Sequence, residues 1–349
     1  MRGFQLILGQ DDPAAAAGTM AAATLDRPDA GGHVLRKGQM IGPAEVAGLR
    51  TLAATAPGTP VSLLALDAED VDESEAARML GAAFAGPGVA LRGPSQGRIR
   101  LAAAQTGLVL VDGARLAAAN TLPDISVYTV FGGTPVAAGT QLGEVKITPL
   151  AAPRAVIEEA ARILAPDTGG PVLEVRAFTP HRAALIVCER LAPDAAERMV
   201  RGLQKKLAWF GSTLDAADVD HIANDRVEVA SRLHAALERG ATLLLAAGGS
   251  TSDPADPTLC ALTDLGATLL RRGVPIHPGS LLWVAQRGEA LIVGVPSCGA
   301  FGEQTSLDLM LPRLLALGAG GLNGLERLAE GGLLTRGMDH RFPPYGALE

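Results

Sequence analysis

The sequence has little cysteine. Its three residues, Cys188, Cys260 and Cys298, lie far apart and form no Cys-x-x-Cys pair. Their odd number and wide spacing argue against a disulfide framework and against a structural zinc site. The histidines show no metal-binding spacing such as His-x-x-x-His. We therefore expect neither disulfides nor zinc to hold this chain together.

Long apolar runs are also missing. No uninterrupted apolar segment approaches the roughly 20 residues of a membrane-spanning helix. The N-terminal stretch MRGFQLILGQDDPAAAAG has one arginine and a short apolar run that Gln10, Asp11 and Asp12 interrupt. This is a poor match to a signal peptide. These absences predict a soluble protein of the reducing cytoplasm that has no membrane partner.

Positive charge is in the minority, since 30 Lys and Arg residues stand against 37 Asp and Glu and the net charge is -7. Only four of the basic residues are lysines. A chain of this charge is not expected to bind nucleic acid non-specifically, although a local basic pocket remains open. We expect no nucleic-acid partner.

Apolar residues, by contrast, make up 48% of the 349 residues, which is enough for two or three domains with buried cores. The first half contains short apolar runs with turn-rich borders, which predict strands. These runs lie at 61–66, 108–113, 125–131 and 142–150. Helices are expected at 42–54, 70–85 and 153–165, before the breaker PDTGGP at 166–171. The sequence predicts a mixed, β-rich N-terminal domain over residues 1–170.

From about residue 172, strand and helix patterns alternate. The nearly all-apolar run at 183–190 is typical of a parallel strand that is covered on both faces. Further strands are expected at 212–222, 241–249 and 289–298, and helices at 194–211, 225–240, 257–266 and 306–318. The alternation predicts an α/β domain over 171–323 with a doubly wound, mostly parallel sheet. We expect the glycine-rich tail, 324–349, to be flexible.

The loop GGSTSDPADP at 248–257 joins a predicted strand to a predicted helix. Gly248 and Gly249 permit a tight turn and the close approach of a ligand. Three hydroxyl side chains follow, those of Ser250, Thr251 and Ser252. Together with the free N–H groups of the helix start they can hold a phosphate, at the sheet edge where α/β proteins bind ligands. An ordinary connection, in which Asp256 caps a helix that begins at Pro257, explains the same residues.

Two more turns near strand ends are expected to face the same pocket. One is His-Pro-Gly-Ser at 277–280 and the other is Pro-Ser-Cys-Gly at 296–299. They add five candidate binding residues, which are Pro278, Gly279, Ser280, Pro296 and Ser297. Cys298 suggests a nucleophile, but no Asp-His pattern accompanies it. Arg271 and Arg272 either supply positive charge to the pocket or lie at a helix end.

These loops resemble the molybdopterin-binding domain shared by molybdopterin molybdenumtransferase, molybdopterin adenylyltransferase and gephyrin. The family has Gly-Gly-x-Ser-x-Gly-Asp-x-Asp at a strand end, and residues 248–256 align with it without a gap. Its Lys-Pro-Gly-Lys and Gly-Leu-Pro-Gly-Asn-Pro stretches correspond to HPGS at 277–280 and GVPSCG at 294–299. The resemblance covers 172–318 well and the first half weakly. It is strongest to a divergent, stand-alone branch of molybdopterin-binding proteins.

The resemblance implies binding of molybdopterin, or of a nucleotide derivative, in molybdenum cofactor biosynthesis. If the protein is an enzyme, the implied reaction is molybdate insertion, with Asp256 and Asp253 in the catalytic positions. Mg²⁺ would bind to Asp253, Asp256 and Glu189, since it prefers oxygen ligands, although caps and solvated loop residues are the plainer interpretation. The implied partners are a molybdoenzyme or a nucleotidyltransferase, and further copies of this chain in a homo-oligomer.

The chain departs from the family pattern at several charged positions. His277 and Ser280 replace the two lysines, and Ser297-Cys298 replaces the Gly-Asn of the last loop. Asp253 replaces a glycine and places negative charge where an anion is expected. The lost cations favour a non-catalytic carrier or sensor over an enzyme. A third hypothesis is a relative of the same fold that acts on a nucleotide.

Overall fold

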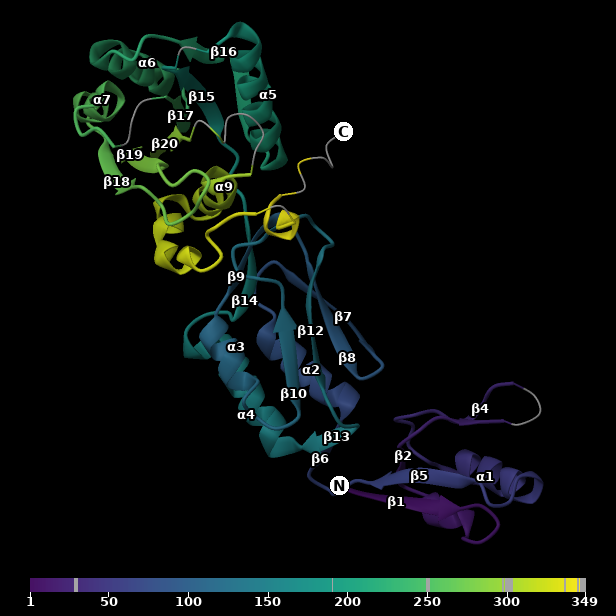
Figure 1. Cartoon of the computed structure of the whole chain (residues 1–349). Helices are drawn as coiled ribbons and strands as arrows, with labels where there is room; N and C mark the ends of the chain where they lie inside the picture. Colours follow the sequence, from purple (N-terminus) through teal and green to yellow (C-terminus); the bar gives the residue numbers. More distant parts are fainter. Residues whose placement is uncertain are drawn as a thin grey trace. The chain divides into compact units, whose positions relative to one another are not determined.

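The computed structural model (Figure 1) describes residues 1–27, 31–189, 191–248, 252–296, 298, 304–335, 337–343 and 345. The chain divides into two compact units, each with a hydrophobic core of its own. The first unit contains Met1–Ala102, Val111–Val130 and Gln141–Leu173. The second unit contains Ala103–Leu110, Phe131–Thr140 and Glu174–Glu349.

The N-terminal part of the first unit is a small antiparallel sheet with one helix packed on it. β5 (Pro60–Ala65) lies between β1 (Arg2–Ile7) and β2 (Met20–Ala21). α1 (Pro43–Thr55) begins at a proline, as predicted, and buries Leu49 against Leu6 and Leu63. The short elements of this part are η1 (Pro13–Ala16), β3 (Leu25–Asp26) and β4 (His33–Leu35).

The rest of the first unit is built on a four-stranded sheet in the order β10-β12-β8-β7. Its strands are β7 (Val89–Ser95), β8 (Arg98–Ala103), β10 (Ile125–Thr129) and β12 (Gln141–Ile147). Val127, Val145 and Ile99 lie in one cross-strand row and are buried, because α2 (Glu73–Phe84) packs on this face. β6 (Asp70–Asp72) pairs with β13 (Ala151–Pro153), and the remaining elements are α3 (Gly113–Ala119), α4 (Arg154–Leu164) and η2 (Pro166–Thr168).

Residues 103–110 and 131–140 belong to the second unit, although the chain on both sides of each belongs to the first. A third small sheet explains this assignment. β9 (Gly107–Val111) lies between β11 (Pro135–Val136) and β14 (Leu173–Ala177). β14 leads into the second unit, and its pairing with β9 assigns 103–110 and 131–140 to that unit. The sequence had placed both segments in a continuous domain of residues 1–170. Pairing between residues so far apart in the chain leaves no local signal.

The second unit contains a six-stranded sheet in the order β16-β15-β17-β20-β19-β18. Its strands are β15 (Arg182–Val187), β16 (Thr213–His221), β17 (Leu243–Ala247), β18 (Thr268–Arg272), β19 (Trp283–Arg287) and β20 (Ala290–Val295). The first four strands in this order are parallel; β19 runs antiparallel to β20, and β18 runs antiparallel to β19. The structure thus has the mostly parallel sheet that the sequence predicted.

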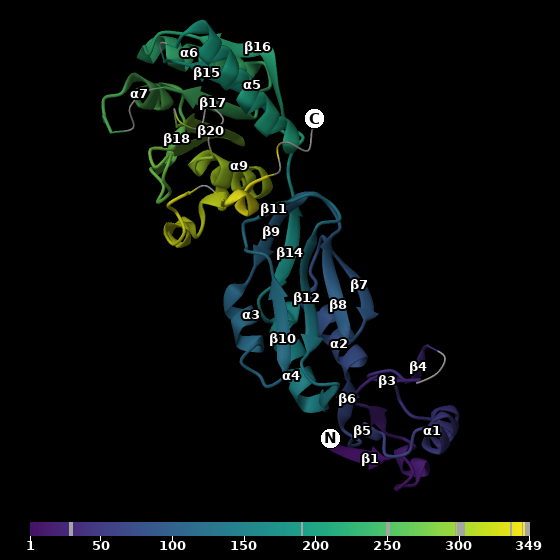
Figure 2. The same cartoon turned by 45° about the vertical axis from the view of Figure 1, so that its right-hand side comes forward.

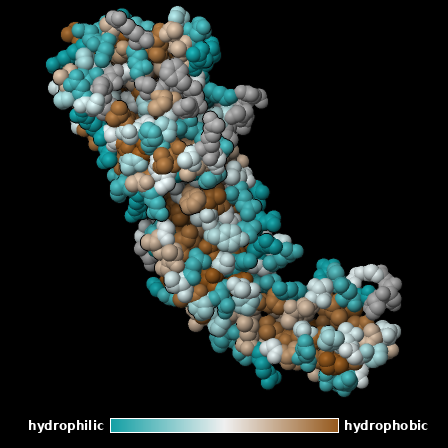
Figure 3. Space-filling model, viewed as in Figure 1, coloured by the Kyte–Doolittle hydropathy of each residue, from teal (hydrophilic) through white to brown (hydrophobic). Residues whose placement is uncertain are grey.

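Helices cover both faces of this sheet (Figures 1 and 2). α5 (Pro193–Trp209) and α9 (Ser306–Leu317) share a core with Leu185 and Leu245. α6 (Arg226–Glu238) and α7 (Pro257–Asp264) share the opposite core with Ile186 and Leu244. Successive strand residues point to opposite faces, so both faces of β15 and β17 are apolar and buried. Among the residues coloured in Figure 3, hydrophilic ones predominate on the visible face of this unit.

The structure differs from the sequence-based expectations at two places in the second unit. Arg271 and Arg272 lie on the edge strand β18, whose five residues are all exposed, and not at a helix end. The part of the expected tail that the structure describes is packed, since Leu325 and Phe342 belong to the core beside α9. Their apolar side chains stabilise this segment through burial. The tail also contains η4 (Leu325–Ala329) and η5 (Asp339–Arg341), after η3 (Gly318–Leu322).

In the described parts of the chain, no helix combines the length and the apolar character that crossing a bilayer requires.

Candidate ligand-binding site

The order of the strands in the second unit creates a natural position for a ligand. β15 connects through α5 to β16 on one side, and β16 connects back through α6 to β17 on the other. α5 follows β15 and α7 follows β17, and these two helices lie on opposite faces, so the two connections leave the sheet in opposite directions. Open α/β sheets bind ligands in the crevice outside such a switch point.

Gly248 and Glu189 meet at this switch point. Gly248 directly follows β17 and has a φ of +105°, a conformation that favours glycine. A Cβ atom there would lie 2.7 Å from Cγ and 2.9 Å from the backbone N of Glu189. The neighbouring strand end is held by the Cys188 N–H, which donates to the carbonyl of Ala247 at 2.7 Å. The close approach of these two strand ends therefore requires glycine at position 248.

Asp256 caps α7, as the sequence predicted. Its Oδ1 accepts the N–H of Thr258 at 2.9 Å, and Pro257 occupies the first helical position. Its Oδ2 lies 3.5 Å from Nδ2 of Asn224, in the loop between β16 and α6. The side chain is 5% exposed. Both carboxylate oxygens thus already face donors of the protein.

Sequence reasoning missed the side chains that complete this network. Thr258 Oγ1 donates to Oδ1 of Asn224 at 2.9 Å and lies 3.9 Å from Sγ of Cys188. The residues that follow β15, β16 and β17 are therefore linked in one buried group. The one local signal for Asn224 was its position directly before Asp225, where the sequence predicted the start of a helix.

Cys188 is held as a neutral thiol. Its pKa is raised to about 11, first by burial and further by the negative charges of Asp256, Glu228 and Glu189, whereas the hydrogen bond from Thr258 lowers the pKa. A thiol of this pKa is a poor nucleophile at neutral pH. The same three carboxylates place negative charge around Cys188, at this end of the sheet.

The two turns predicted to join the site meet at the start of α9. Gly279 has a φ of +99°, and a Cβ there would lie 2.4 Å from Oγ of Ser306 and 3.2 Å from Cγ of Pro296. Ser306 donates from Oγ to the carbonyl of Gly279 at 2.6 Å and from its N–H to that of Pro278 at 3.0 Å. The loop at 278–280 is therefore seated on the first turn of α9, beside the residue that follows β20.

The other predicted residues lie in different surroundings. Ser252, Asp253 and Ser280 are exposed. The carboxylate of Asp253 accepts the N–H of Ala255 at 2.8 Å, as in a local turn. His277 is also exposed, and its backbone pairs with the segment at 332–334. Four candidate binding residues, Gly249, Ser250, Thr251 and Ser297, lie outside the described residues.

The described side chains do not fit the implied Mg²⁺ site. No group of three or more His, Cys, Asp and Glu side chains in that part of the chain lies close enough to hold a metal ion. Asp253 is engaged in its own turn, and Asp256 in the cap of α7. We derive no step of a reaction through a metal.

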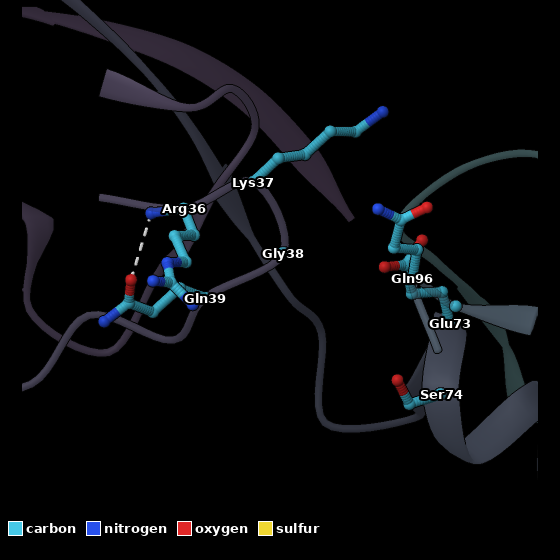
Figure 4. Close-up of a pocket in the computed structure, with 8 residues that line it drawn as sticks. Arg36, Lys37, Gly38, Gln39, Glu73, Ser74 and Gln96 are labelled. Atoms are coloured by element: carbon cyan, nitrogen blue, oxygen red, sulfur yellow. Dashed lines mark hydrogen bonds between the residues drawn. The ribbon is translucent and has the colours of Figure 1, made fainter. Parts of the chain in front are cut away.

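A hollow of about 460 Å³ lies in the first unit (Figure 4). Lys37 and Glu73 line it, together with Gly38, Gln96 and Gly97. Burial raises the pKa of the Glu73 carboxyl, and the nearby Lys37 opposes that effect. A Cβ at Gly97 would clash with the Glu73 carboxyl group, so the close fit fixes this side chain. None of the predicted site residues is found there.

Comparison with known proteins leaves the family open. No protein-family model matches the chain, and no curated protein matches it. Among solved structures, the chain is similar to the molybdopterin biosynthesis MoeA protein from Pyrococcus horikosii. The two share 15% identity over 72% of this chain and 80% of that one, with a TM-score of 0.30. Similarity at this level establishes neither a family nor a ligand for this chain.

Proposed function

We propose that the second unit binds a phosphorylated pterin of the molybdopterin type, or its nucleotide derivative, in molybdenum cofactor biosynthesis. The observation that supports the binding site is the switch point between β15 and β17, where Gly248 is seated against Glu189. A bend without a side chain lets a ligand approach the backbone closely. Such a crevice is where sheets of this kind bind nucleotides and related molecules.

The sequence motif narrows this general site to a pterin. Residues 248–256 and 294–299 follow the order and spacing of the molybdopterin-binding family, and Asp256 stands at its last aspartate. The structure gives Asp256 a definite role at that position, since it caps α7 and joins the buried network with Thr258 and Asn224. We infer that the family position is retained for the shape of the loop.

A carrier or sensor is the second candidate function, and the charge of the crevice favours it. Asp256, Glu189 and Glu228 all raise the pKa of Cys188, so the described part of the crevice is acidic. Lysines that could neutralise molybdate are replaced by His277 and Ser280. Tight binding without turnover is the result that this arrangement favours over molybdate insertion.

Native mass spectrometry of the full chain tests binding. The purified protein is mixed without oxygen with molybdopterin released from a molybdoenzyme, and separately with AMP and GMP as nucleotide probes. We expect a one-to-one complex with molybdopterin and a complex at least tenfold weaker for Gly248→Ala, whose Cβ would clash with Glu189. Gly240→Ala is the matched control, because Gly240 also has a positive φ but has open space around it.

Three results would contradict the proposal. They are no binding of molybdopterin, preferred binding of a nucleotide, or equal binding by both glycine variants. Adding molybdate to the complex then separates the two candidate functions. Formation of molybdenum cofactor supports insertion, whereas an unchanged complex supports the carrier.

A further inference from the structure

A buried polar cluster lies between α5, α9 and the C-terminal segment, by which we mean the described residues 337–343 and 345. Its centre is the Asp308 carboxylate, which has no exposed surface. Nζ of Lys206 lies 2.7 Å from Oδ1 and 3.0 Å from Oδ2, and the hydroxyl of Tyr345 donates to Oδ1 at 3.0 Å. The Thr305 N–H donates to Oδ2 at 2.9 Å. Donors thus occupy the four positions at which a carboxylate accepts hydrogen bonds.

Tyr345 is a neutral donor in this cluster. Burial raises the pKa of its phenol well above the usual range, and the charge of Asp308 acts in the same direction. Its ring lies beside Phe210, with centroids 6.4 Å apart, and beneath Nζ of Lys206 at 5.7 Å. One side chain of the C-terminal segment therefore contacts both charged members of the cluster.

The cluster is connected to the candidate site through the first turn of α9. Thr305 and Asp308 form a capping box, in which each side chain accepts a backbone N–H of that turn. Ser306, which follows Thr305, holds the loop at 278–280 through two hydrogen bonds. Gly279 has no space for a Cβ against Ser306, so the loop follows any shift of this turn.

We propose that Tyr345 is a positioning residue for the candidate site. Its hydroxyl completes the coordination of Asp308, which orders the first turn of α9 and so sets the place of the loop at 278–280. Docking of the C-terminal segment thereby controls the shape of one wall of the ligand site. The effect on ligand affinity rests on the proposed function, whereas the effect on the loop does not.

Hydrogen exchange of the full chain without ligand tests the positioning role. Tyr345→Phe removes the hydroxyl and keeps the ring. Two amides report on the loop, those of Ser306, bonded to Pro278, and Leu282, bonded to Gly279. We expect exchange at both to be about tenfold faster, since a hydrogen bond to a charged group contributes at least that much. Amides of β15 and β17 should change less than twofold.

The matched control is Tyr128→Phe, since the chain has two tyrosines. The hydroxyl of Tyr128 also donates to a carboxylate, that of Glu144 at 2.7 Å, but in the first unit. It should leave exchange at Ser306 and Leu282 unchanged. Unchanged exchange in Tyr345→Phe, or uniformly faster exchange throughout the second unit, would overturn the proposal.

Ligand affinity supplies the second measurement. With molybdopterin as the probe, we expect Tyr345→Phe to bind about tenfold more weakly than Tyr128→Phe. If the wild-type chain does not bind molybdopterin, the proposed function fails and the exchange result still decides the positioning role. If both variants bind equally well, the C-terminal segment does not control the site and the proposal is overturned.

Discussion

The buried pair of Lys206 and Asp308 provides the sharpest test of how the second unit is stabilised. The side chain of Asp308 has no exposed surface and that of Lys206 is 7% exposed. Asp308→Asn removes the negative charge and keeps one oxygen, which can accept from Tyr345 or from Thr305 but not from both, because these two donors bond different oxygens of Asp308. Lys206→Met removes the positive charge and keeps the length of the side chain. Each variant removes one charge of the pair and leaves the other buried.

The magnitude follows from the cost of burying an isolated charge. Breaking a buried ion pair by removing one partner costs about 3–5 kcal/mol, because the other charge loses both water and its partner. In the double variant Lys206→Met/Asp308→Asn neither charge remains. We expect it to lose about 1–3 kcal/mol, because the amide leaves one of the two buried donors without its acceptor. The double variant should therefore be more stable than either single variant.

Urea unfolding followed by tryptophan fluorescence measures this unit on its own. Both tryptophans, Trp209 in α5 and Trp283 in β19, belong to the second unit. Unfolding of the first unit therefore does not contribute to the signal directly. The control is the exposed pair of Glu197 and Arg201 on α5, whose side chains are 68% and 64% exposed. Glu197→Gln should cost less than about 0.5 kcal/mol.

Two results would refute this reasoning. If either single variant loses less than about 1 kcal/mol, the pair is not as buried as its position indicates. If the double variant loses the sum of the single losses, the two charges do not stabilise each other and a double-mutant cycle gives no coupling.

Three further predictions concern the candidate site. Gly248→Ala should lower the free energy of unfolding by about 2–4 kcal/mol through strain and overpacking, and Gly240→Ala by about 1–2 kcal/mol through strain alone, as urea unfolding would show. Asn224→Ala should cost about 1–3 kcal/mol, because it removes the acceptor of Thr258 Oγ1, and an unchanged urea midpoint would contradict the network. Cys188 should react with iodoacetamide at pH 8.5 only after the other two cysteines, which mass spectrometry of digests would detect. The pKa of Cys188 in the folded chain, about 11, lies above the ordinary value of 9.0, so the unfolded chain releases the thiol proton first. The stability that the protonated thiol gives the folded state is complete below pH 9 and is lost as the pH rises from 9 to 11.

Local patterns in the sequence were sufficient for several elements. Continuous apolar runs predicted β15 and β17, because strands buried on both faces need apolar side chains at every position. The interpretation of Asp256 as a helix cap was correct, since it caps α7. The helix expected at 70–85 begins at Glu73, after Asp72 as its cap.

Other elements left too weak a signal in the sequence. The first strand, β1, and the hairpin of β7 and β8 were not predicted. β7 has the sequence VALRGPS, which contains arginine, glycine and proline. Three consecutive residues, Leu91, Arg92 and Gly93, are exposed, so the strand has no regular alternation of buried and exposed positions. Such a segment becomes a strand because its neighbours in space supply hydrogen bonds, which no local pattern records.

The same division holds for the candidate site. The sequence marked Gly248, Asp256 and Gly279 as unusual, because glycine and aspartate at loop positions have a local conformational meaning. It did not mark Asn224 or Thr258, whose roles arise only when three loops meet. The metal ligands expected at Asp253, Asp256 and Glu189 stay a prediction, to which the described side chains give no support.

The sequence by itself determined the alternation of strands and helices in the second unit, and with it the mostly parallel sheet, because the apolar pattern and the caps act within a few residues. Only the tertiary structure decided which strand ends lie side by side, which carboxylates surround Cys188, and that Tyr345 reaches Asp308. Those contacts join residues that are far apart in the chain, and burial and hydrogen-bond geometry, which select them, exist only once the chain has folded.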